Sequence, residues 1–428
     1  MNSSRTRIGG RLAIVLILVL AFTVRAAVYF ENPHPNDGAG LAAEQAEMAR
    51  NIVDHGTWFA VNPQAFELVK NRQAQQQRLV DPETVDFTRV DRQSSAMPAV
   101  DQMPGVAIVL AGIWGVTGNE TYALIQWLQI LLDTAMVLLV YWIALRLTKA
   151  RGIATTAALL YALWPGAIVV AKRPMLDTWA AFFTIGCVAA FLWARDRPTS
   201  LRRLAVVGVV AGLGIYFRPF IVLLPIALAL VATPGGGWRR RLLWISAPTV
   251  VALILLAPWT IRNYYEFNRF IPTRTGLGQA VFEGTKQASS DEASAQYVRK
   301  HGKGAAYGSP AYDDFLLSRA AHAIADRPGF YLRLVARRSL FLLPCLLLLL
   351  AWRRWRSGTL ILVAAAAATI VPYLLIGDDT RFYLPAAFAY IILLAMAAEV
   401  LLSFARSRIA SAGSSPRALP SAVERHQR

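Results

Sequence analysis

The stretch LLVYWIALRLTKARGIATTAALLYALWPGAIVVAKRPMLDT, residues 138–178, sets the pattern of the whole chain. A short basic cluster, Arg146, Lys149 and Arg151, separates two apolar runs, and the second run leads to the acidic residue Asp177. Similar basic clusters lie at 5–11, 195–203, 239–241, 353–356 and 406–428. Short cytoplasmic loops of membrane proteins retain Lys and Arg, and two apolar runs separate each cluster from the next. The clusters therefore mark one side of a membrane, and the remaining polar segments lie on the other side.

Composition agrees with a membrane protein. Hydrophobic residues make up 56% of the 428 residues, which is too apolar for an ordinary soluble domain. In a soluble protein, the net charge of +18 would suggest binding to nucleic acid. Here much of the excess lies in loops that face anionic lipid, so the predicted partners include membrane lipids and no nucleic acid. Cys187 and Cys345 both lie inside apolar runs, which excludes a disulfide framework or a CxxC metal site.

The apolar runs predict an all-α polytopic membrane protein with about ten transmembrane helices, since a ~30 Å hydrocarbon core needs about 20 residues per helix. The predicted spans are approximately Leu12–Tyr29, Thr121–Leu145, Gly152–Ala171, Asp177–Ala194, Leu204–Phe217, Phe220–Thr233, Leu242–Trp259, Leu340–Trp352, Thr359–Ile376 and Phe382–Phe404. Both termini are then cytoplasmic. The short apolar segment Pro104–Gly118 is placed in the interface, because a crossing there would move the Arg146 cluster outside. Arg337 and Arg338, before the eighth span, are expected to snorkel at the outer interface.

The predicted spans divide the chain into a transmembrane domain, residues 1–404, and a tail, residues 405–428. The domain carries two long outer loops, at approximately 31–103 and 260–339. The tail is rich in Ser, Ala and Arg and is expected to be disordered and cytoplasmic. Nearly all candidate chemistry therefore belongs to the outer loops and to the outer ends of the spans.

An acidic residue in the first outer loop is the first candidate. In LAAEQAEMARNIVDHGTWF, Leu41, Met48 and Ile52 recur at helical spacing, and Gly56 ends the helix. Glu44 lies about 60° from that stripe at 3.6 residues per turn. The pattern predicts an amphipathic helix on the membrane surface with a carboxylate at its border. The alternative is a plain interfacial helix whose acidic side chains face water.

Asp177 is the second candidate, because it stands at the outer end of the fourth span. An acid at the mouth of an apolar helix is costly unless it is solvated, paired or functional. Two other roles fit the same pattern: a helix N-cap that accepts backbone N–H bonds, or an ion pair with Lys172 or Arg173.

Two arginines lie at the predicted outer surface beside aromatic residues. Arg262 belongs to APWTIRNYYEFNRFIP, residues 257–272, and Arg381 belongs to GDDTRFYLP, residues 377–385. Arginine binds phosphate with paired hydrogen bonds. An arginine at headgroup depth also serves as a phospholipid anchor, so both roles are open for each residue.

The motifs occur in an order that resembles the GT-C glycosyltransferases. The resemblance is to the branch that contains protein O-mannosyltransferases and the lipid A aminoarabinose transferase. It rests on Glu44 with MARNI and Gly56, on MPGVAIVLAGIWGVTGN at 103–119, on residues 138–178, and on FRPF, PWTIRNY and RFYLP at 217–220, 258–264 and 381–385. It covers roughly residues 12–404. Many relatives carry an Asp-Asp or Asp-Glu pair where this chain has Asn36-Asp37, so Asp37 is an alternative to Glu44.

The resemblance implies an activity. Such enzymes move a sugar from a polyprenyl phosphate to an acceptor on the outer side of the membrane. Glu44 is then the general base, Asp177 shares that role or positions the acceptor, and the reaction inverts the anomeric carbon. Arg262 and Arg381, with Lys172 and Arg173 as further candidates, would bind the donor phosphate.

The resemblance also implies the partners and the place of the reaction. The donor is a polyprenyl-phosphate-linked sugar, and the acceptor is a glycan, a lipid or a protein. The location is the inner membrane of a bacterium, with the active site on the periplasmic face. No metal site is assigned and no cofactor is certain, but Asp37, Glu44 and Asp177 offer oxygen ligands for Mg²⁺ or Mn²⁺.

A transporter or flippase of a lipid-linked sugar is the alternative function. Such proteins use charges within the membrane, and Arg25 and Asp133 lie inside the first and second predicted spans. Against this, the other candidate acids lie at the outer rim rather than at the midplane, and no two-half repeat is visible.

Overall fold

The computed structural model describes residues 2–31, 39–56, 59–61, 96–235, 237–288, 290–302, 305–377 and 380–413. Within these ranges, only the backbone is described for residues 2–11, 39–44, 59–61, 96–98, 292, 380–382 and 410–413. The elements in chain order are α1 (Asn2–Glu31), α2 (Ala39–His55), β1 (Phe59–Val61), β2 (Ala96–Pro98), α5 (Gly105–Thr117), α6 (Ala123–Thr148), α7 (Arg151–Ala162), α8 (Pro165–Ala171), α9 (Leu176–Ala194), α10 (Leu201–Ile215), η3 (Pro219–Val222), α11 (Leu223–Ala232), α12 (Trp238–Phe267), α13 (Leu277–Gly284), α14 (Asp291–His301), α15 (Pro310–Asp326), α16 (Pro328–Arg338), η4 (Ser339–Leu347), α17 (Leu348–Ile376), η5 (Thr380–Ala386) and α18 (Ala387–Gly413).

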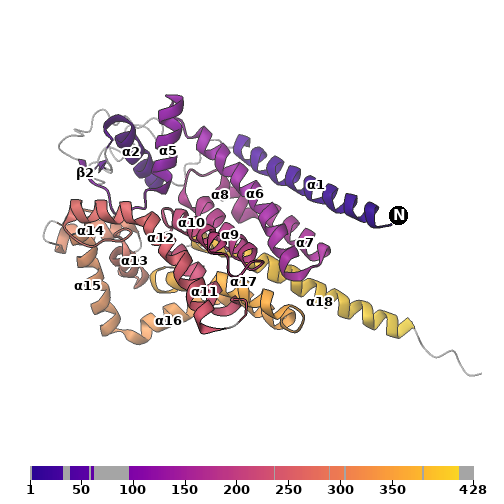
Figure 1. Cartoon of the computed structure of the whole chain (residues 1–428). Helices are drawn as coiled ribbons and strands as arrows, with labels where there is room; N and C mark the ends of the chain where they lie inside the picture. The colour runs from indigo at the N-terminus through magenta and orange to yellow at the C-terminus, as the bar shows by residue number, and fades with distance from the viewer. Residues whose placement is uncertain are drawn as a thin grey trace, which may run out of the picture.

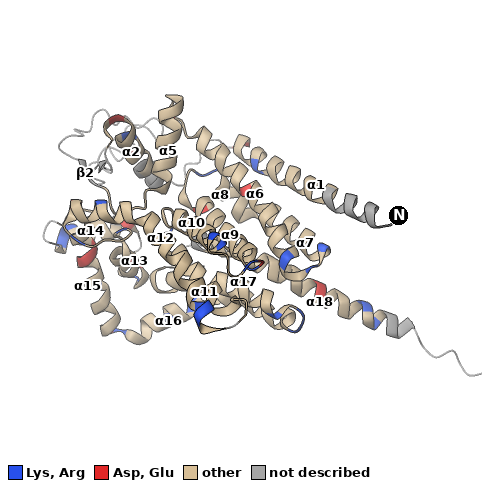
Figure 2. Cartoon of the chain, viewed as in Figure 1, with Lys and Arg blue, Asp and Glu red and all other residues tan. Residues whose placement is uncertain are grey.

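Long apolar helices form a bundle, and the two loops gather at one end of it (Figure 1). The start of α1 and the end of α18 lie at the opposite end, away from α2 and α13–α15. Figure 2 shows Lys and Arg residues, coloured blue, on α7 and α18 at that opposite end. We call the two ends the loop end and the basic end. This arrangement agrees with the alternation predicted from the basic clusters.

The all-α membrane architecture is confirmed, but the predicted count of ten spans is not. Within the described residues, six helices are long and apolar enough to cross a membrane, or seven if the bent pair α7–α8 counts as one span. Each predicted span coincides with helical residues, yet α10 has only 15 residues and η3–α11 covers only Pro219–Ala232. The eighth and ninth predicted spans lie in one helical stretch, Pro328–Ile376, which is kinked between them at Trp355. The apolar segments were therefore correctly placed, but by length and continuity fewer of the described helices qualify as candidate membrane spans.

Proline explains the bend between α7 and α8. Pro165 occupies the first turn of α8, where its missing N–H is tolerated, and α8 turns away from α7 by 51°. Such a break frees backbone carbonyls at the end of α7, and these groups need partners inside a bundle.

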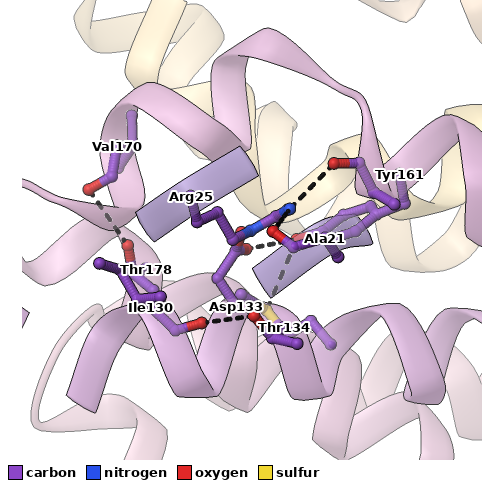
Figure 3. Close-up of polar contacts among 10 residues, drawn as sticks. Ala21, Arg25, Ile130, Asp133, Thr134, Tyr161, Val170 and Thr178 are labelled. Carbon is purple, nitrogen blue, oxygen red and sulfur yellow. Dashed lines mark hydrogen bonds and ion pairs between the residues drawn. The ribbon is translucent and has the colours of Figure 1, made fainter. Parts of the chain in front are cut away.

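One of those partners is Arg25, as Figure 3 shows. Its guanidinium donates to the carbonyl oxygen of Ala162, the last residue of α7, at 2.9 Å, and to that of Ala21 at 3.0 Å. Its Nε donates to the carboxylate of Asp133 on α6, which also accepts a hydrogen bond from the hydroxyl of Tyr161 at 3.3 Å. The predicted intramembrane charges therefore form one buried pair that joins α1, α6 and α7.

The first loop packs on the protein rather than only on the membrane. Met48 and Ala49 of α2 are buried, and Met48 packs with Ala107 of α5. Met48 and Ile52 of the predicted apolar stripe therefore pack toward α5, and the side chain of Leu41 lies outside the described part. β1 and β2 form a short antiparallel pair beside α2, with Phe59 opposite Pro98.

The second loop folds as α13, α14 and α15, and a buried arginine holds it to the bundle. Arg338 donates to the carbonyl oxygen of Gly284 at 2.5 Å and to that of Leu374 at 3.2 Å. The predicted snorkelling of Arg338 is wrong, because these two carbonyls at helix ends are its partners; Arg337 is exposed. At the other end of the chain, α18 continues to Gly413, past the predicted domain boundary at 404. Residues 414–428 of the predicted tail lie outside the described residues.

Candidate active site at the loop end

Asp177 is buried in the first turn of α9, with 2% of its surface exposed. Its carboxylate accepts a hydrogen bond from Nη2 of Arg218 at 2.5 Å. The N-cap of α9 is Met175, with no side-chain capping bond, so Asp177 does not act as the cap. Its ion-pair partner is also neither Lys172 nor Arg173, but a residue that follows α10.

Arg218 comes from the break between α10 and η3. Pro219 begins η3 and disfavours helix at the residue before it, so Arg218 is extended, with φ −142°. Its guanidinium lies over the ring of Tyr373 on α17, 5.8 Å from the ring centroid. The Tyr373 hydroxyl lies close enough to three charged side chains for their charges to act on it: Asp177, Arg218 and Arg274. These four side chains therefore form one cluster.

Arg274 brings a second cation to this cluster from the second loop. Its Nη1 donates to the backbone oxygen of Asp101 at 2.9 Å and to the side-chain oxygen of Gln102 at 3.4 Å. In the described part of the chain, no carboxylate lies within ion-pair distance of Arg274. Burial lowers the pKa of its guanidinium, and the positive charge of Arg218 lowers it further. Arg274 is therefore a partly buried cation with neutral hydrogen-bond partners.

The motif PWTIRNY places Arg274 in the cluster. Side chains of Trp259, Thr260 and Asn263, all on α12, donate hydrogen bonds to the backbone carbonyls of residues 271–273. The Asn263 bond measures 3.0 Å and the Thr260 bond 2.8 Å. These bonds hold the turn that leads directly into Arg274.

Arg262, predicted to bind the donor phosphate, links the two loops. Its Nη1 donates to the carbonyl oxygen of Ala99 at 2.6 Å and to the side-chain oxygen of Asn263 at 3.0 Å. Its guanidinium also lies over Trp259 and Phe267, at 5.1 and 5.7 Å from the ring centroids. These contacts fix the segment before α5 against the end of α12.

Lys172 and Arg173 follow α8, in the segment that leads to Asp177. Nζ of Lys172 donates to the carbonyl oxygen of Val28 at 3.4 Å. Two glutamines of α6 hold the backbone of this segment. Gln126 donates to the carbonyl oxygen of Lys172 at 2.8 Å, and Gln129 donates to that of Arg173 at 2.9 Å. The buried amides thus fix the approach to α9.

Asp101 is an acidic residue of the cluster that sequence reasoning missed. It stands between β2 and α5, and Gly308 of the second loop packs against its carboxylate. A side chain at Gly308 would meet that carboxylate at 3.1–3.2 Å, and its φ of +72° also favours glycine. Burial raises the pKa of Asp101, while the nearby Arg274 opposes the shift.

Three predicted residues cannot be placed fully. Asp37 lies outside the described residues. The backbone of Glu44 belongs to α2 and that of Arg381 to η5, but their side chains are outside the described part. The neighbour of Glu44, Gln45, is buried and accepts a hydrogen bond from the Ala107 N–H at 3.0 Å. The backbone of α2 is thereby held beside the segment that carries Asp101.

A metal site was left open by the sequence. Among the residues that the structure describes, no group of three or more His, Cys, Asp or Glu side chains could hold a metal ion. Of the three predicted oxygen donors, only the side chain of Asp177 is described, and its observed partner is a guanidinium.

The geometry can be compared with known proteins. Residues 101–261 match the family described as dolichyl-phosphate-mannose-protein mannosyltransferase. That range includes Asp101, Asp177 and Arg218. A stretch of 135 residues is 28% identical to the undecaprenyl phosphate-alpha-4-amino-4-deoxy-L-arabinose arabinosyl transferase of Erwinia tasmaniensis, covering 30% of this chain and 24% of that protein.

Solved structures extend the similarity over nearly the whole chain. The aminoarabinose transferase ArnT from Cupriavidus metallidurans, bound to undecaprenyl phosphate, matches with a TM-score of 0.51 at 16% identity, over 95% of this chain and 64% of that one. The oligosaccharyltransferase AglB from Archaeoglobus fulgidus, in complex with an inhibitory peptide and a dolichol-phosphate, matches with a TM-score of 0.55 at 12% identity. That match covers 97% of this chain and 53% of AglB.

The chain has the GT-C fold. It resembles the protein O-mannosyltransferase and aminoarabinose transferase branch, as the sequence motifs predicted. It spans about half the length of the archaeal oligosaccharyltransferase, and its matched stretch covers about a quarter of the arabinosyl transferase. The cluster around Asp177 lies at the loop end of this fold, where α9, α10 and α17 meet the two loops.

The predicted site residues did not include four members of the cluster: Arg218, Arg274, Tyr373 and Asp101. The Arg218-Pro219 pair was recognised as part of the FRPF motif and as the boundary between two predicted spans, with no role at the site. Arg274 stands in a turn, IPTRTG, with no periodic pattern. Asp101 directly precedes the interfacial helix, and an acid at that position was the one local signal available.

Proposed function

We propose that this protein is a membrane glycosyltransferase. It would take a sugar from a polyprenyl-phosphate donor and transfer it to an acceptor hydroxyl at the loop end, on the periplasmic or outer face. The fold supports this proposal, because the similar structures of ArnT and AglB hold undecaprenyl phosphate and dolichol-phosphate. The donor class and the enzymatic activity are proposals for this chain.

Arg274 is the single observation that carries the proposal. A partly buried guanidinium whose described hydrogen-bond partners are neutral is electrostatically suited to receive an anion. Arg218 stands nearby with its one described carboxylate partner, and the Tyr373 hydroxyl lies in the same cluster. A lipid phosphate entering here would meet two cations in a site that is partly shielded from water, where charge stabilisation is strong.

The reaction is a substitution at the anomeric carbon. The acceptor oxygen forms a bond to that carbon, and the bond between the carbon and the phosphate oxygen breaks. The electron pair stays on the polyprenyl phosphate, whose added negative charge Arg274 and Arg218 would stabilise. The acceptor proton passes to a carboxylate on the opposite side of the sugar, so the configuration inverts.

Four carboxylates are candidates for that proton. Glu44 remains our proposed base, with Asp37 as the alternative in the same loop. Asp177 is held by Arg218, so we assign it the role of orienting that arginine or the acceptor. Asp101 joins the candidates, because burial raises its pKa and a base of higher pKa takes a proton more readily.

The phosphate-binding roles of the predicted arginines are revised in this proposal. Arg274 and Arg218 would contact the phosphate, and Arg381 remains a candidate. Arg262 would act by holding the two loops together, and Lys172 and Arg173 by shaping the entrance to α9. Mg²⁺ or Mn²⁺ remains a possible cofactor, and the acceptor class, whether glycan, lipid or protein, is left open.

The test uses purified full-length protein in lipid nanodiscs with a panel of polyprenyl-phosphate sugars. Release of polyprenyl phosphate is measured with and without an envelope extract as acceptor. We expect extract-dependent release that Glu44→Gln abolishes. Arg274→Gln should lower kcat/KM by about 10²- to 10³-fold, the loss typical for one donor to a developing oxyanion.

Arg269→Gln is the matched control, because Arg269 lies in the same loop but pairs with Asp314 in an exposed ion pair at 2.6 Å. It should retain activity within a few fold. Equal activity of wild type and Arg274→Gln would contradict the phosphate role. No release from any donor by folded protein would contradict the transferase and favour transport.

A further inference from the structure

A partly open cavity of about 360 Å³ lies at the basic end, far from the cluster at Asp177. It lies where α6 and α9 end, beside residues 357 and 358 of α17. Its volume falls within the range of about 300–1,000 Å³ that is usual for small-molecule sites. Its lining residues are Arg146, Leu147, Lys149, Leu192, Arg195, Asp196, Pro234, Ser357 and Gly358.

The lining carries three cationic side chains and one carboxylate. That carboxylate, Asp196, forms an ion pair with Arg146 and lies 4.0 Å from Arg203, which is outside the lining. Among the described residues, no side-chain hydrogen bond or ion pair involves Lys149 or Arg195. Lys149 and Arg195 therefore present positive charge in the cavity that no described side chain pairs with.

Arg195 is the most constrained of these cations. Its Nε is buried and has no hydrogen-bond partner among the described residues. Burial lowers the pKa of its guanidinium, and the positive charge of Arg146 lowers it further. An anion in the cavity would relieve both the missing hydrogen bond and the repulsion.

The backbone of α17 adds to the positive potential of the cavity. At Trp355 the helix is interrupted by a non-helical conformation, with φ −135° and ψ 42°. Ser357 and Gly358 stand in the first turn after this kink, and both line the cavity. The first turn of a helix carries a partial positive charge, which favours an anion.

From this geometry we propose a second ligand site, which binds the phosphate group of a phosphoester anion at the basic end. The basic end faces the headgroup layer of the membrane, so the expected source is an anionic phospholipid. A soluble phosphoester has the same charge and the same acceptor oxygens. The site is independent of the proposed transferase reaction, because it shares no residue with the cluster at Asp177.

The test compares full-length protein in nanodiscs of phosphatidylcholine, of phosphatidylcholine with phosphatidylglycerol, and of phosphatidylcholine with glycerol phosphate in solution at constant ionic strength. The thermal unfolding midpoint is the first readout, and the phospholipid retained in native mass spectrometry is the second. We expect wild type to be stabilised by phosphatidylglycerol. Arg195→Gln should bind that lipid about tenfold more weakly, as expected for loss of one charge-assisted hydrogen bond.

The effect of Arg195→Gln on stability without an anionic ligand makes the test specific. In phosphatidylcholine alone, Arg195→Gln should keep or raise the unfolding midpoint, because it removes a partly buried cation that Arg146 repels. Lys149→Asn is the second variant; Lys149 has φ 58°, a conformation that Asn tolerates. Arg241→Gln is the control, since Arg241 is an exposed arginine of the same end outside the cavity.

Stabilisation by phosphatidylglycerol alone, lost in Arg195→Gln and kept in Arg241→Gln, supports a lipid headgroup. Stabilisation by glycerol phosphate as well, with the same dependence on Arg195, supports the site with a soluble source. The proposal is overturned if wild type shows no stabilisation by either anion. It is also overturned if Arg241→Gln loses the effect as fully as Arg195→Gln and Lys149→Asn do, because general surface charge would then explain it.

Discussion

At the scale of single residues, two buried ion pairs have different surroundings. Arg25 and Asp133 lie inside the bundle, and the guanidinium also satisfies backbone carbonyls of α1 and α7. Arg218 and Asp177 lie at the loop end, beside a second cation and a tyrosine. The first pair thus ties helices together, whereas the second belongs to a site with charge available for a ligand.

The Arg25 pair gives a stability prediction. Asp133→Leu leaves the guanidinium of Arg25 buried without its carboxylate, which should lower the unfolding free energy by about 3–5 kcal/mol. The double variant Arg25→Met with Asp133→Leu should lose less, because no unpaired charge remains. Reversible unfolding in one detergent system measures both. A double variant as unstable as Asp133→Leu would contradict the explanation.

At the scale of elements, close helix packing depends on small residues. Gly208 and Gly212 are four residues apart on α10, and both face α12. A Cβ at Gly208 would lie 2.5 Å from the backbone oxygen of Pro248 and 2.7 Å from Cβ of Val251. This spacing of small residues is the usual way in which two membrane helices approach closely. The pair explains how the short α10 is held in the bundle.

Gly208→Ala should therefore destabilise the protein, by about 1–3 kcal/mol, because the backbone of α12 must shift. Gly112→Ala on α5 is the control. A Cβ there would meet nothing within 4 Å, so the change should be neutral or slightly stabilising. Thermal unfolding in matched lipid compares the two. Equal midpoints for both variants would rule out close packing at Gly208.

At the scale of the whole molecule, the two loops form one structure over the bundle. Arg262 joins α12 to the first loop, Arg274 joins the second loop to the first, and Arg338 joins the second loop to α17. Within the second loop, burial raises the pKa of Glu283 and of Asp313. The negative charge of Asp291 adds to the shift of Glu283.

These pKa shifts predict a pH dependence. A carboxyl group with a raised pKa in the folded state binds more protons there than in the unfolded state. Its contribution is therefore largest at low pH and is lost as pH rises through the folded pKa. Stability should fall from mildly acidic pH toward neutral pH. Glu283→Gln and Asp313→Asn should flatten this slope in thermal unfolding. The control is Asp326→Asn, at an exposed position of α15, which should leave the slope unchanged.

Much of the architecture could be predicted from the sequence, because it depends on local properties. Apolar length and the placement of Arg and Lys determined that helices cross a membrane and that the loops gather at one end. The order of short motifs determined the GT-C resemblance, which the fold confirms. Asp177 was correctly placed at the mouth of α9 for the same reason, since it directly precedes an apolar run.

Only the tertiary structure decided which charges meet. Arg218 is 41 residues from Asp177, the carboxylate that it binds, and Arg274 is 173 residues from the backbone oxygen of Asp101 to which it donates; no local pattern links either pair. The predicted count of ten spans is not confirmed, because an apolar run does not show where a helix breaks or merges. Local sequence fixes which segments avoid water, whereas the partner of a buried charge is fixed by how those segments pack.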